Sequence, residues 1–258
     1  MIRRDWTSPA GTAHWLLISQ VEHARLSGEL CRSWLAVQAL PIDIREELVA
    51  AVFRHDDGWA EWERAPEVDA KTGRPREFTE MPLPESLAIW SRSIDQSMAL
   101  GDLAPYVISG HFCALMRRFT HWRDQGPEQV ALGEAFLSDQ QAKQTVWLDR
   151  WRATDPAART VSLAQQALAW LQLFDALSLW LCCAERKDVQ EFDPPVGPKF
   201  TLQPRSAEEI LVSPWPMEGA TLSLELTGRV VQAVKYGDAE SLAKTTGIPT
   251  LLRWELLE

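Results

Sequence analysis

The chain has 258 residues, of which 46% are hydrophobic and 24% are charged. This ordinary composition can build one sizeable core, and it excludes disordered, collagen-like and disulfide-dense proteins. The formal net charge of −10 argues against a protein that binds duplex nucleic acid. The 13 tryptophans, against 2 tyrosines, supply large apolar side chains, each with one N–H group that needs a partner when buried.

The four cysteines, Cys31, Cys113, Cys182 and Cys183, show no CxxC spacing and lie in apolar segments. We therefore expect buried free thiols in a reducing compartment. The N-terminal segment is polar and has no hydrophobic signal core. The longest apolar stretch, 164–183, is broken by polar residues, which favours a buried helix over a membrane span. Together these features predict a cytoplasmic protein without a membrane partner.

Most of the first two-thirds of the chain has apolar residues at helical spacing. Within it, Pro41, Asp43 and Glu46 are typical of a helix start, and the helix that they open runs to about residue 56. The other ranges predicted as helices are 15–35, 84–100, 104–122, 128–152 and 161–186.

Proline and glycine mark two segments that are not helical. Residues 58–84 predict a long structured loop, and a loop of this length inside a compact domain is often functional. Residues 193–204 predict a connector, and strand-like patterns follow over 220–226, 229–236 and 249–257.

The domain organisation is predicted from this shift in pattern. We expect a mainly α fold, with one helical domain over residues 1–192. Residues 193–258 would then form the proline-rich connector and a small C-terminal antiparallel β-sheet packed on the helical body. No internal repeat is visible in the chain.

Histidine and aspartate recur on the helix faces that should point into the core. His23, His111 and Asp175 each share a helical face with apolar residues, and His55-Asp56 ends its helix. One such histidine is usually a hydrogen-bonded core residue, and one buried aspartate is usually paired with arginine or a backbone N–H. Uncompensated burial of several carboxylates is costly, however. Four such sites on four helices favour a metal or catalytic cluster.

The order His…His-Asp…Asp resembles the HD-domain superfamily of metal-dependent phosphohydrolases. The resemblance implies an HD-domain-like helical bundle and a site for one or two divalent ions. It implies metal ligands at His23, His55, Asp56, His111 and Asp175. A nitrogen and oxygen ligand set without cysteine suits Fe, Mn, Ni, Co or Zn and does not choose among them.

Four segments also resemble, more narrowly, the DUF3891 family of uncharacterised bacterial HD-like proteins. These segments are 20–28 (QVEHARLSG), 55–59 (HDDGW), 109–111 (SGH) and 174–179 (FDALSL). The loop over 65–75 is similar to that of the family as well. This resemblance spans nearly the whole chain and implies a fold and a site, but no substrate.

The resemblance implies a hydrolase that acts on a phosphoester or nucleotide-like small molecule. A metal ion lowers the pKa of bound water, and the resulting hydroxide would attack phosphorus. We expect Asp56 and His111 to serve in this chemistry, with Asp56 as a bridge if there are two ions. Asp57 would either orient a ligand imidazole or cap the helix end.

Three residues are candidates for contacts with the substrate. Gln20, three residues before the first histidine, could bind a substrate oxygen or be a surface amide. Trp59 could stack on a ring or only pack in the core. Arg74, like Arg25 and Arg54, could neutralise phosphate or be a solvated surface residue.

Two other functions fit the same residues. The second histidine pair of binuclear relatives is incomplete here, which favours a non-catalytic HD-like sensor that binds a small ligand. Some HD-like proteins bind two irons and activate oxygen, so a di-iron oxygenase of HD-like type is the third reading. Each predicts a small-molecule partner, and none indicates an oligomeric state.

Overall fold

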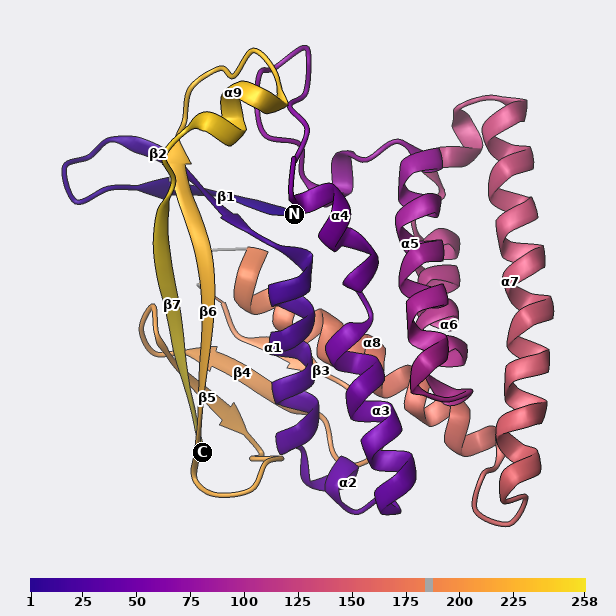
Figure 1. Ribbon diagram of the computed structural model, residues 1–258. Coiled ribbons are helices and arrows are strands. Elements are labelled where there is room, and N and C mark those ends of the chain that lie inside the picture. The colour runs from indigo at the N-terminus through magenta and orange to yellow at the C-terminus, as the bar shows by residue number, and fades with distance from the viewer. Residues whose placement is uncertain (184–187) are drawn as a thin grey trace.

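The structure, a computed structural model, describes residues 1–183 and 188–258. Of the described residues, 54% are helical and 20% are strand. Within the described residues, seven strands form one mixed, curled sheet in the shape of a half-barrel, and helices pack on one side of it (Figure 1). The prediction of a mainly α helical bundle with a small C-terminal antiparallel sheet is therefore wrong.

The helices form a layer that extends away from the sheet, with the first helix, α1, next to the strands (Figure 1). The helices are α1 (Gln20–Ser33), α2 (Leu35–Gln38), α3 (Ile42–Arg54), α4 (Ala60–Glu63), α5 (Leu83–Ser97), α6 (Leu103–Arg118), α7 (Pro127–Thr154), α8 (Val161–Cys183) and α9 (Ala239–Lys244). Single 3-10 turns are η1 (Asp57–Trp59), η2 (Phe78–Glu80), η3 (Met98–Leu100) and η4 (Thr120–Asp124).

The long helices α3, α5, α6, α7 and α8 confirm five of the ranges predicted from helical periodicity, with ends that differ by a few residues. The predicted end of the last range, at residue 186, lies outside the described residues. The loop predicted over 58–84 is largely irregular and contains the short helices α4 and η2. The connector over 193–204 contains no helix, as predicted, and ends in a strand.

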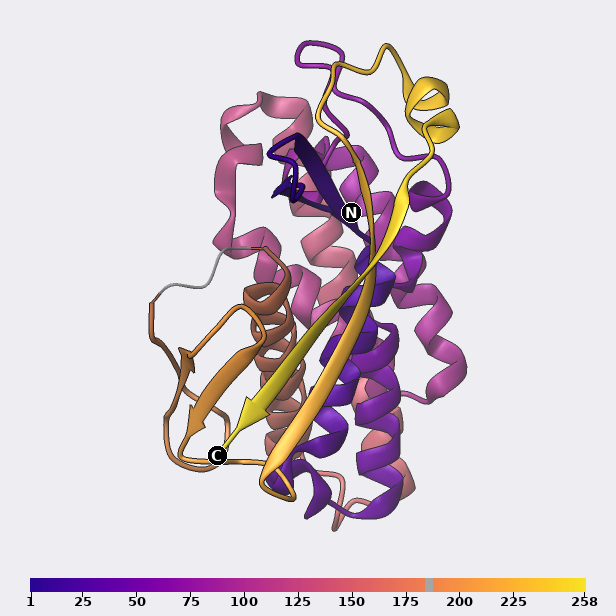
Figure 2. The same ribbon diagram turned by 90° about the vertical axis from the view of Figure 1, so that its left-hand side faces the viewer.

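The sheet joins the two ends of the chain. Its strands are β1 (Ile2–Thr7), β2 (Ala13–Ile18), β3 (Gln190–Phe192), β4 (Phe200–Pro204), β5 (Glu209–Ser213), β6 (Thr221–Gln232) and β7 (Ile248–Leu257). Their order is β1-β2-β6-β7-β5-β4-β3, and only β5 and β7 pair in parallel. Figure 2 shows the long β6–β7 ribbon crossing in front of α1. Strands from both sides of the predicted domain boundary at residue 192 thus share one sheet.

The N-terminal part of the predicted helix 15–35 is a strand. Four consecutive apolar residues, 15–18, are buried in β2, which pairs with β6. A run of buried residues without a gap suits a strand that is covered on both faces. Ser19 then begins α1, because its side chain accepts a hydrogen bond from the backbone N–H of Glu22.

One aromatic cluster connects the helical layer to the sheet. Trp34, at the end of α1, packs edge-on against Trp170 and Phe174 of α8 and against Phe200 of β4, with ring centroids between 5.1 and 6.0 Å apart. Edge-to-face pairs of this kind are favourable beyond the area that they bury. Helices and sheet therefore share one continuous core.

α8 is the helix of the described chain that is long and apolar enough to cross a membrane. Half of its most apolar 18-residue window is buried inside the protein, which is the burial of a core helix, as predicted. None of the four cysteines, all of which lie in the described part of the chain, forms a disulfide, and three of them are buried. Cys183 is exposed because it ends α8 beyond the core, so the prediction of a buried thiol is wrong there.

Candidate metal centre

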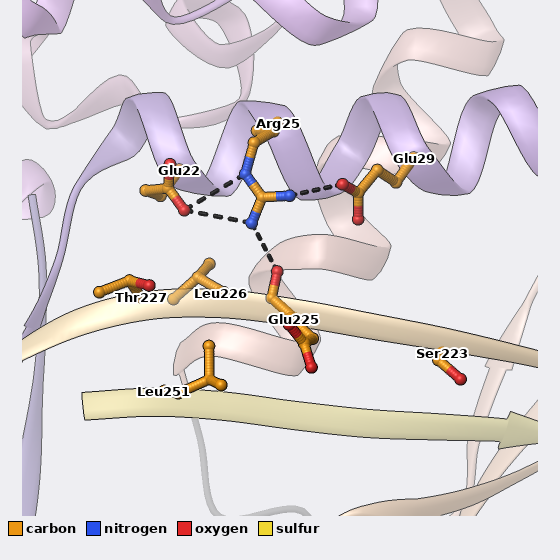
Figure 3. A pocket seen from close by; sticks show the side chains of 8 residues that line it. All are labelled: Glu22, Arg25, Glu29, Ser223, Glu225, Leu226, Thr227 and Leu251. Carbon is orange, nitrogen blue, oxygen red and sulfur yellow. Dashed lines mark hydrogen bonds and ion pairs between the residues drawn. The ribbon is translucent and has the colours of Figure 1, made fainter.

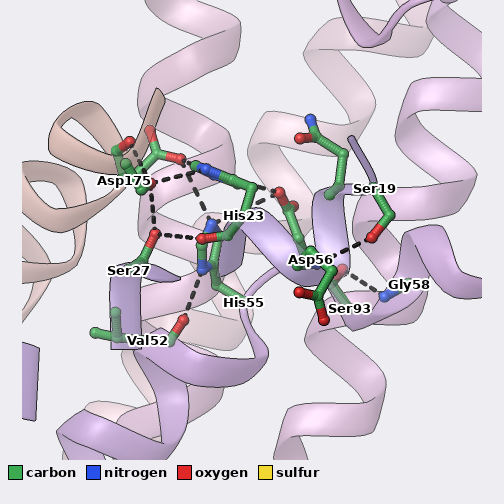
Figure 4. A network of polar contacts seen from close by, with 12 residues as sticks. Ser19, His23, Ser27, Val52, His55, Asp56, Gly58, Ser93 and Asp175 are labelled. Atoms are coloured by element: carbon green, nitrogen blue, oxygen red, sulfur yellow. Dashed lines mark hydrogen bonds and ion pairs between the residues drawn. The ribbon is translucent and has the colours of Figure 1, made fainter. Parts of the chain in front are cut away.

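Four helical segments bring the predicted histidines and aspartates together in the interior. His23 lies on α1, His55 and Asp56 follow the end of α3, His111 lies on α6, and Asp175 lies on α8. Their exposed fractions are 1%, 0%, 5%, 3% and 9% in the same order. Figure 4 shows these residues except His111. Each helix turns its residue inward because apolar neighbours on the same face pack into the core.

Four donor atoms face one another at the centre of this group. Nε2 of His23 lies 3.0 Å from Oδ1 of Asp175 and 4.0 Å from Oδ2 of Asp56. Nε2 of His55 lies 3.5 Å and 3.6 Å from the same two oxygens. Two ligands that are each about 2.0–2.2 Å from one metal ion stand about 3–4 Å apart. The four distances between a ring nitrogen and a carboxylate oxygen therefore fall in the range expected around a metal ion.

His111 belongs to a second set of donors that overlaps the first. One donor atom from each of His23, His55 and Asp56 lies within 4.8 Å of the others, and the same is true of His55, His111 and Asp175. The ring of His55 makes edge contacts with both other imidazoles, at centroid distances of 5.5 and 5.6 Å. His55 is therefore common to both sets.

The unpartnered nitrogen of His55 tests whether these residues fit a metal ion. Nδ1–H of His55 donates to the backbone carbonyl of Val52 at 2.8 Å, because a carbonyl only accepts. Nε2 of the neutral ring then carries a lone pair. This atom is buried and, among the described residues, has no hydrogen-bond partner, although two carboxylate oxygens stand nearby. A lone pair between two anions fits a cation.

The charges around the group also favour a cation. Burial lowers the pKa of His55, but Asp56 and Asp175 outweigh it and raise this pKa to about 9. Burial raises the pKa of Asp175, but His111 and His23 hold it well below its ordinary value. Burial prevails at Asp56, whose pKa is raised, and at His111, whose pKa is lowered. The two carboxylates stabilise a proton on His55, and by the same attraction the buried group could hold a metal ion in place of that proton.

Asp57 lies beside this group without joining it. Its Oδ2 accepts a hydrogen bond from Nε of Arg54 at 2.6 Å, and both side chains are partly exposed. The described residues show no hydrogen bond from Asp57 to a ligand imidazole. The backbone carbonyl of Val52 orients His55 instead.

The three candidates for substrate contacts lie in different surroundings. Gln20 is buried beside the ligands on α1, and its Oε1 has no partner in the described part of the chain. Trp59 is buried, and its backbone N–H donates to the carbonyl of Asp56 at 3.0 Å, while its ring packs edge-on against Trp62. Arg74 is exposed on the loop before α5, outside the buried group.

Arg25 faces a separate surface pocket of about 570 Å³ between α1 and the strands β6 and β7 (Figure 3). Its guanidinium donates to the carboxylates of Glu22 and Glu29 and to the backbone carbonyl of Glu225. These acceptors engage the guanidinium at the sheet side of α1. The structure thus does not bring Arg25 to the donor atoms of the buried group.

One family model matches the chain, that of a protein of unknown function, DUF3891, over residues 6–233. The chain belongs to the DUF3891 family. The match covers both the segments that carry the buried histidines and aspartates and most of the sheet. No curated protein and no solved structure matches this DUF3891 chain.

Two residues of this DUF3891 site had no predicted role. Ser27 and Ser178 are fully buried, and Ser178 contacts Nδ1 of His23. The available signal was spacing, since Ser27 follows His23 by one helical turn and Ser178 follows Asp175 by three residues on the same face. Serine at such spacing occurs on many helix faces, so the signal alone indicates no contact.

Proposed function

We propose that this DUF3891 chain is a metal-dependent hydrolase of the HD type that acts on a phosphoester or nucleotide-like small molecule. The observation that carries the proposal is the convergence of two imidazoles and two carboxylates around the unpartnered Nε2 of His55. His23, His55, Asp56 and Asp175, whose ring nitrogens and carboxylate oxygens lie 3.0–4.0 Å apart, would hold one divalent ion. His111, which groups with His55 and Asp175, would add a donor for a second. Such an ion makes hydroxide from a bound water near neutral pH.

The chain's own residues would prepare this chemistry in three ways. The carbonyl of Val52 keeps the lone pair of His55 on Nε2. Burial of the ligands excludes bulk water, which strengthens every charge interaction within the site. Gln20 presents a buried amide oxygen without a partner among the described residues, and it would accept a hydrogen bond from a substrate hydroxyl or amine.

Metal content and turnover test this proposal together. Protein purified without chelator is analysed for metals and then assayed with a panel of phosphoesters and nucleotides under each divalent ion. We expect one or two equivalents of metal and a turnover that depends on it. His55→Ala and Asp56→Ala should lose both, whereas His121→Ala, at an exposed histidine of η4, should keep both. Wild-type protein without metal and without turnover would overturn the proposal.

A second candidate is a sensor that binds a small ligand without turnover. The near-complete burial of all five donor residues favours it, because a closed site limits the exchange of substrate and product. A nucleotide that raises the melting temperature of the metal-loaded protein, and is recovered intact, would support this candidate over the hydrolase. Hydrolysis of that nucleotide would exclude it.

We also propose a cytoplasmic location for the protein. None of the four cysteines, all within the described residues, forms a disulfide, and three are buried, as expected in a reducing compartment. Fractionation of cells that express the full chain, followed by immunoblotting, tests the location.

A further inference from the structure

Two fully buried serines lie at the Nδ1 side of the His23 ring. Oγ of Ser178 is 2.8 Å from Nδ1 of His23, and Oγ of Ser27 is 2.7 Å from Oγ of Ser178. Each hydroxyl also faces a backbone carbonyl, Ser178 that of Asp175 at 2.9 Å and Ser27 that of His23 at 3.1 Å. The serine pair thus joins α1 to α8 beside two of the proposed ligands.

The number of available hydrogens indicates which atom donates between His23 and Ser178. The four contacts need four hydrogens, and two of these contacts end on carbonyl oxygens, which only accept. The two hydroxyls supply two hydrogens. A proton on Nδ1 of His23 supplies a third, so three contacts are made instead of two. Because both serines are fully buried, unmade hydrogen bonds between them and the ring are costly, so the serine pair favours the form with Nδ1 protonated, whereas Oδ1 of Asp175, 3.0 Å from Nε2, favours the other form.

The opposite tautomer of His23 would prevent metal binding at this ring. In that form Nε2–H donates to Oδ1 of Asp175, 3.0 Å away, and Nε2 has no lone pair for a cation. Ser178 opposes this form because its oxygen is the acceptor that Nδ1–H needs. We propose that Ser178, supported by Ser27, is a positioning residue that holds His23 in the tautomer able to bind a metal ion through Nε2.

This proposal deepens the proposed function and rests on it for the identity of the ligands. The proposal also distinguishes His23 from His55, two proposed histidine ligands that differ in what fixes their tautomer. His55 obtains the same tautomer from the backbone carbonyl of Val52, which no side-chain substitution removes. His23 obtains it from a side chain, so its ligand form depends on Ser178. His55 can therefore serve as an internal reference when Ser178 is changed.

The first measurement is the affinity for Zn²⁺ alone, by competition with a chromophoric chelator. We expect Ser178→Ala to bind Zn²⁺ about 10–100-fold more weakly than the wild type. Ser178→Thr keeps a hydroxyl and should restore most of the affinity, and Ser27→Ala should lose less than Ser178→Ala. Ser97→Ala is the matched control: Ser97 is a buried helical serine whose hydroxyl, among the described residues, donates only to the carbonyl of Ile94, and its removal should leave the affinity unchanged.

The second measurement needs no metal. Long-range ¹H–¹⁵N spectra of the five histidines, at about pH 10 and so above the pKa of about 9 of His55, report which ring nitrogen carries the proton. We expect His23 to be protonated on Nδ1 in the wild type and on Nε2 in Ser178→Ala, with the His55 signals unchanged. A Ser178→Ala protein that keeps Nδ1–H, or that binds Zn²⁺ as tightly as Ser97→Ala, overturns the proposal. If the wild type binds no Zn²⁺, the proposed metal centre fails, and these spectra still decide the role of Ser178.

Discussion

His55 carries a proton in the metal-free protein at neutral pH, because its pKa is raised from 6.5 to about 9. A folded-state pKa above the unfolded value means that the protonated ring stabilises the fold. This contribution is complete below about pH 6.5 and is lost as the pH rises through about 9. Denaturant unfolding of the metal-free protein should therefore show lower stability at pH 9 than at pH 6.5. In His55→Gln this part of the pH dependence should be absent.

Metal binding should have the opposite pH dependence at the same residue. A metal ion has to displace the proton on His55, so the affinity should rise with pH, by up to about tenfold per unit below pH 9. Calorimetry of Zn²⁺ binding in buffers of different ionisation enthalpy counts the protons released. We expect about one proton near pH 7.5 and fewer above pH 9. An affinity that does not change with pH would contradict a metal ion bound through Nε2 of His55.

Asp56 and Asp57 are adjacent in the chain but differ in their surroundings. Asp56 is buried among the imidazoles, whereas Asp57 pairs with Arg54 where both side chains are partly exposed. Asp56→Asn should abolish metal binding because the amide removes one of two anions at the centre. Asp57→Asn should keep the metal affinity and cost less than about 1 kcal/mol of stability. Metal analysis and denaturant unfolding of the two variants provide the comparison.

At the scale of the elements, Gly58 allows the turn after Asp56 to lie directly against α5. A Cβ at this position would stand 2.2 Å from the backbone carbonyl oxygen of Ile89 and 2.6 Å from the backbone nitrogen of Ser93. Backbone atoms of a packed helix cannot move aside cheaply, so Gly58→Ala should lower stability by about 1–3 kcal/mol and weaken metal binding. Gly237→Ala, where a Cβ would meet nothing within 4 Å, should be tolerated. Equal unfolding midpoints in the two variants would contradict this packing.

Elements whose residues repeat with the helical period could be predicted from the sequence, and so could the ligands that lie on their buried faces. The strand over 15–18 could not be predicted, because four apolar residues in a row show neither the helical nor the alternating strand period. These residues form a strand because they pair with β6, from the other end of the chain. The two predicted strands, 220–226 and 229–236, form the one strand β6, whose ladder with β7 continues through Gly228 and which ends at Gln232. The contact between Ser178 and His23 depends on how α1 and α8 pack, which spacing does not show.

At the scale of the whole molecule, the proposed metal ligands and the contacts with the sheet lie on the same helices. α1 carries His23 on one face and lies against β6, and α8 carries Asp175 and, through Phe174, contacts the cluster around Trp34. A ligand that binds only the folded chain stabilises all elements that must be folded for binding. The metal should therefore stabilise the sheet as well as the helices.

Thermal unfolding tests this coupling together with the predicted boundary at residue 192. Trp254 of β7 and Trp170 of α8 are both buried, so Trp254→Phe and Trp170→Phe each remove one reporter from the fluorescence change, while circular dichroism follows the helices. We expect coincident transitions by both probes, shifted upward together by Zn²⁺ at 100 times its dissociation constant, equivalent to about 2.7 kcal/mol. Chelator should reverse the shift. A sheet transition that occurs separately and does not respond to Zn²⁺ would mean that residues 193–258 fold independently of the helical layer.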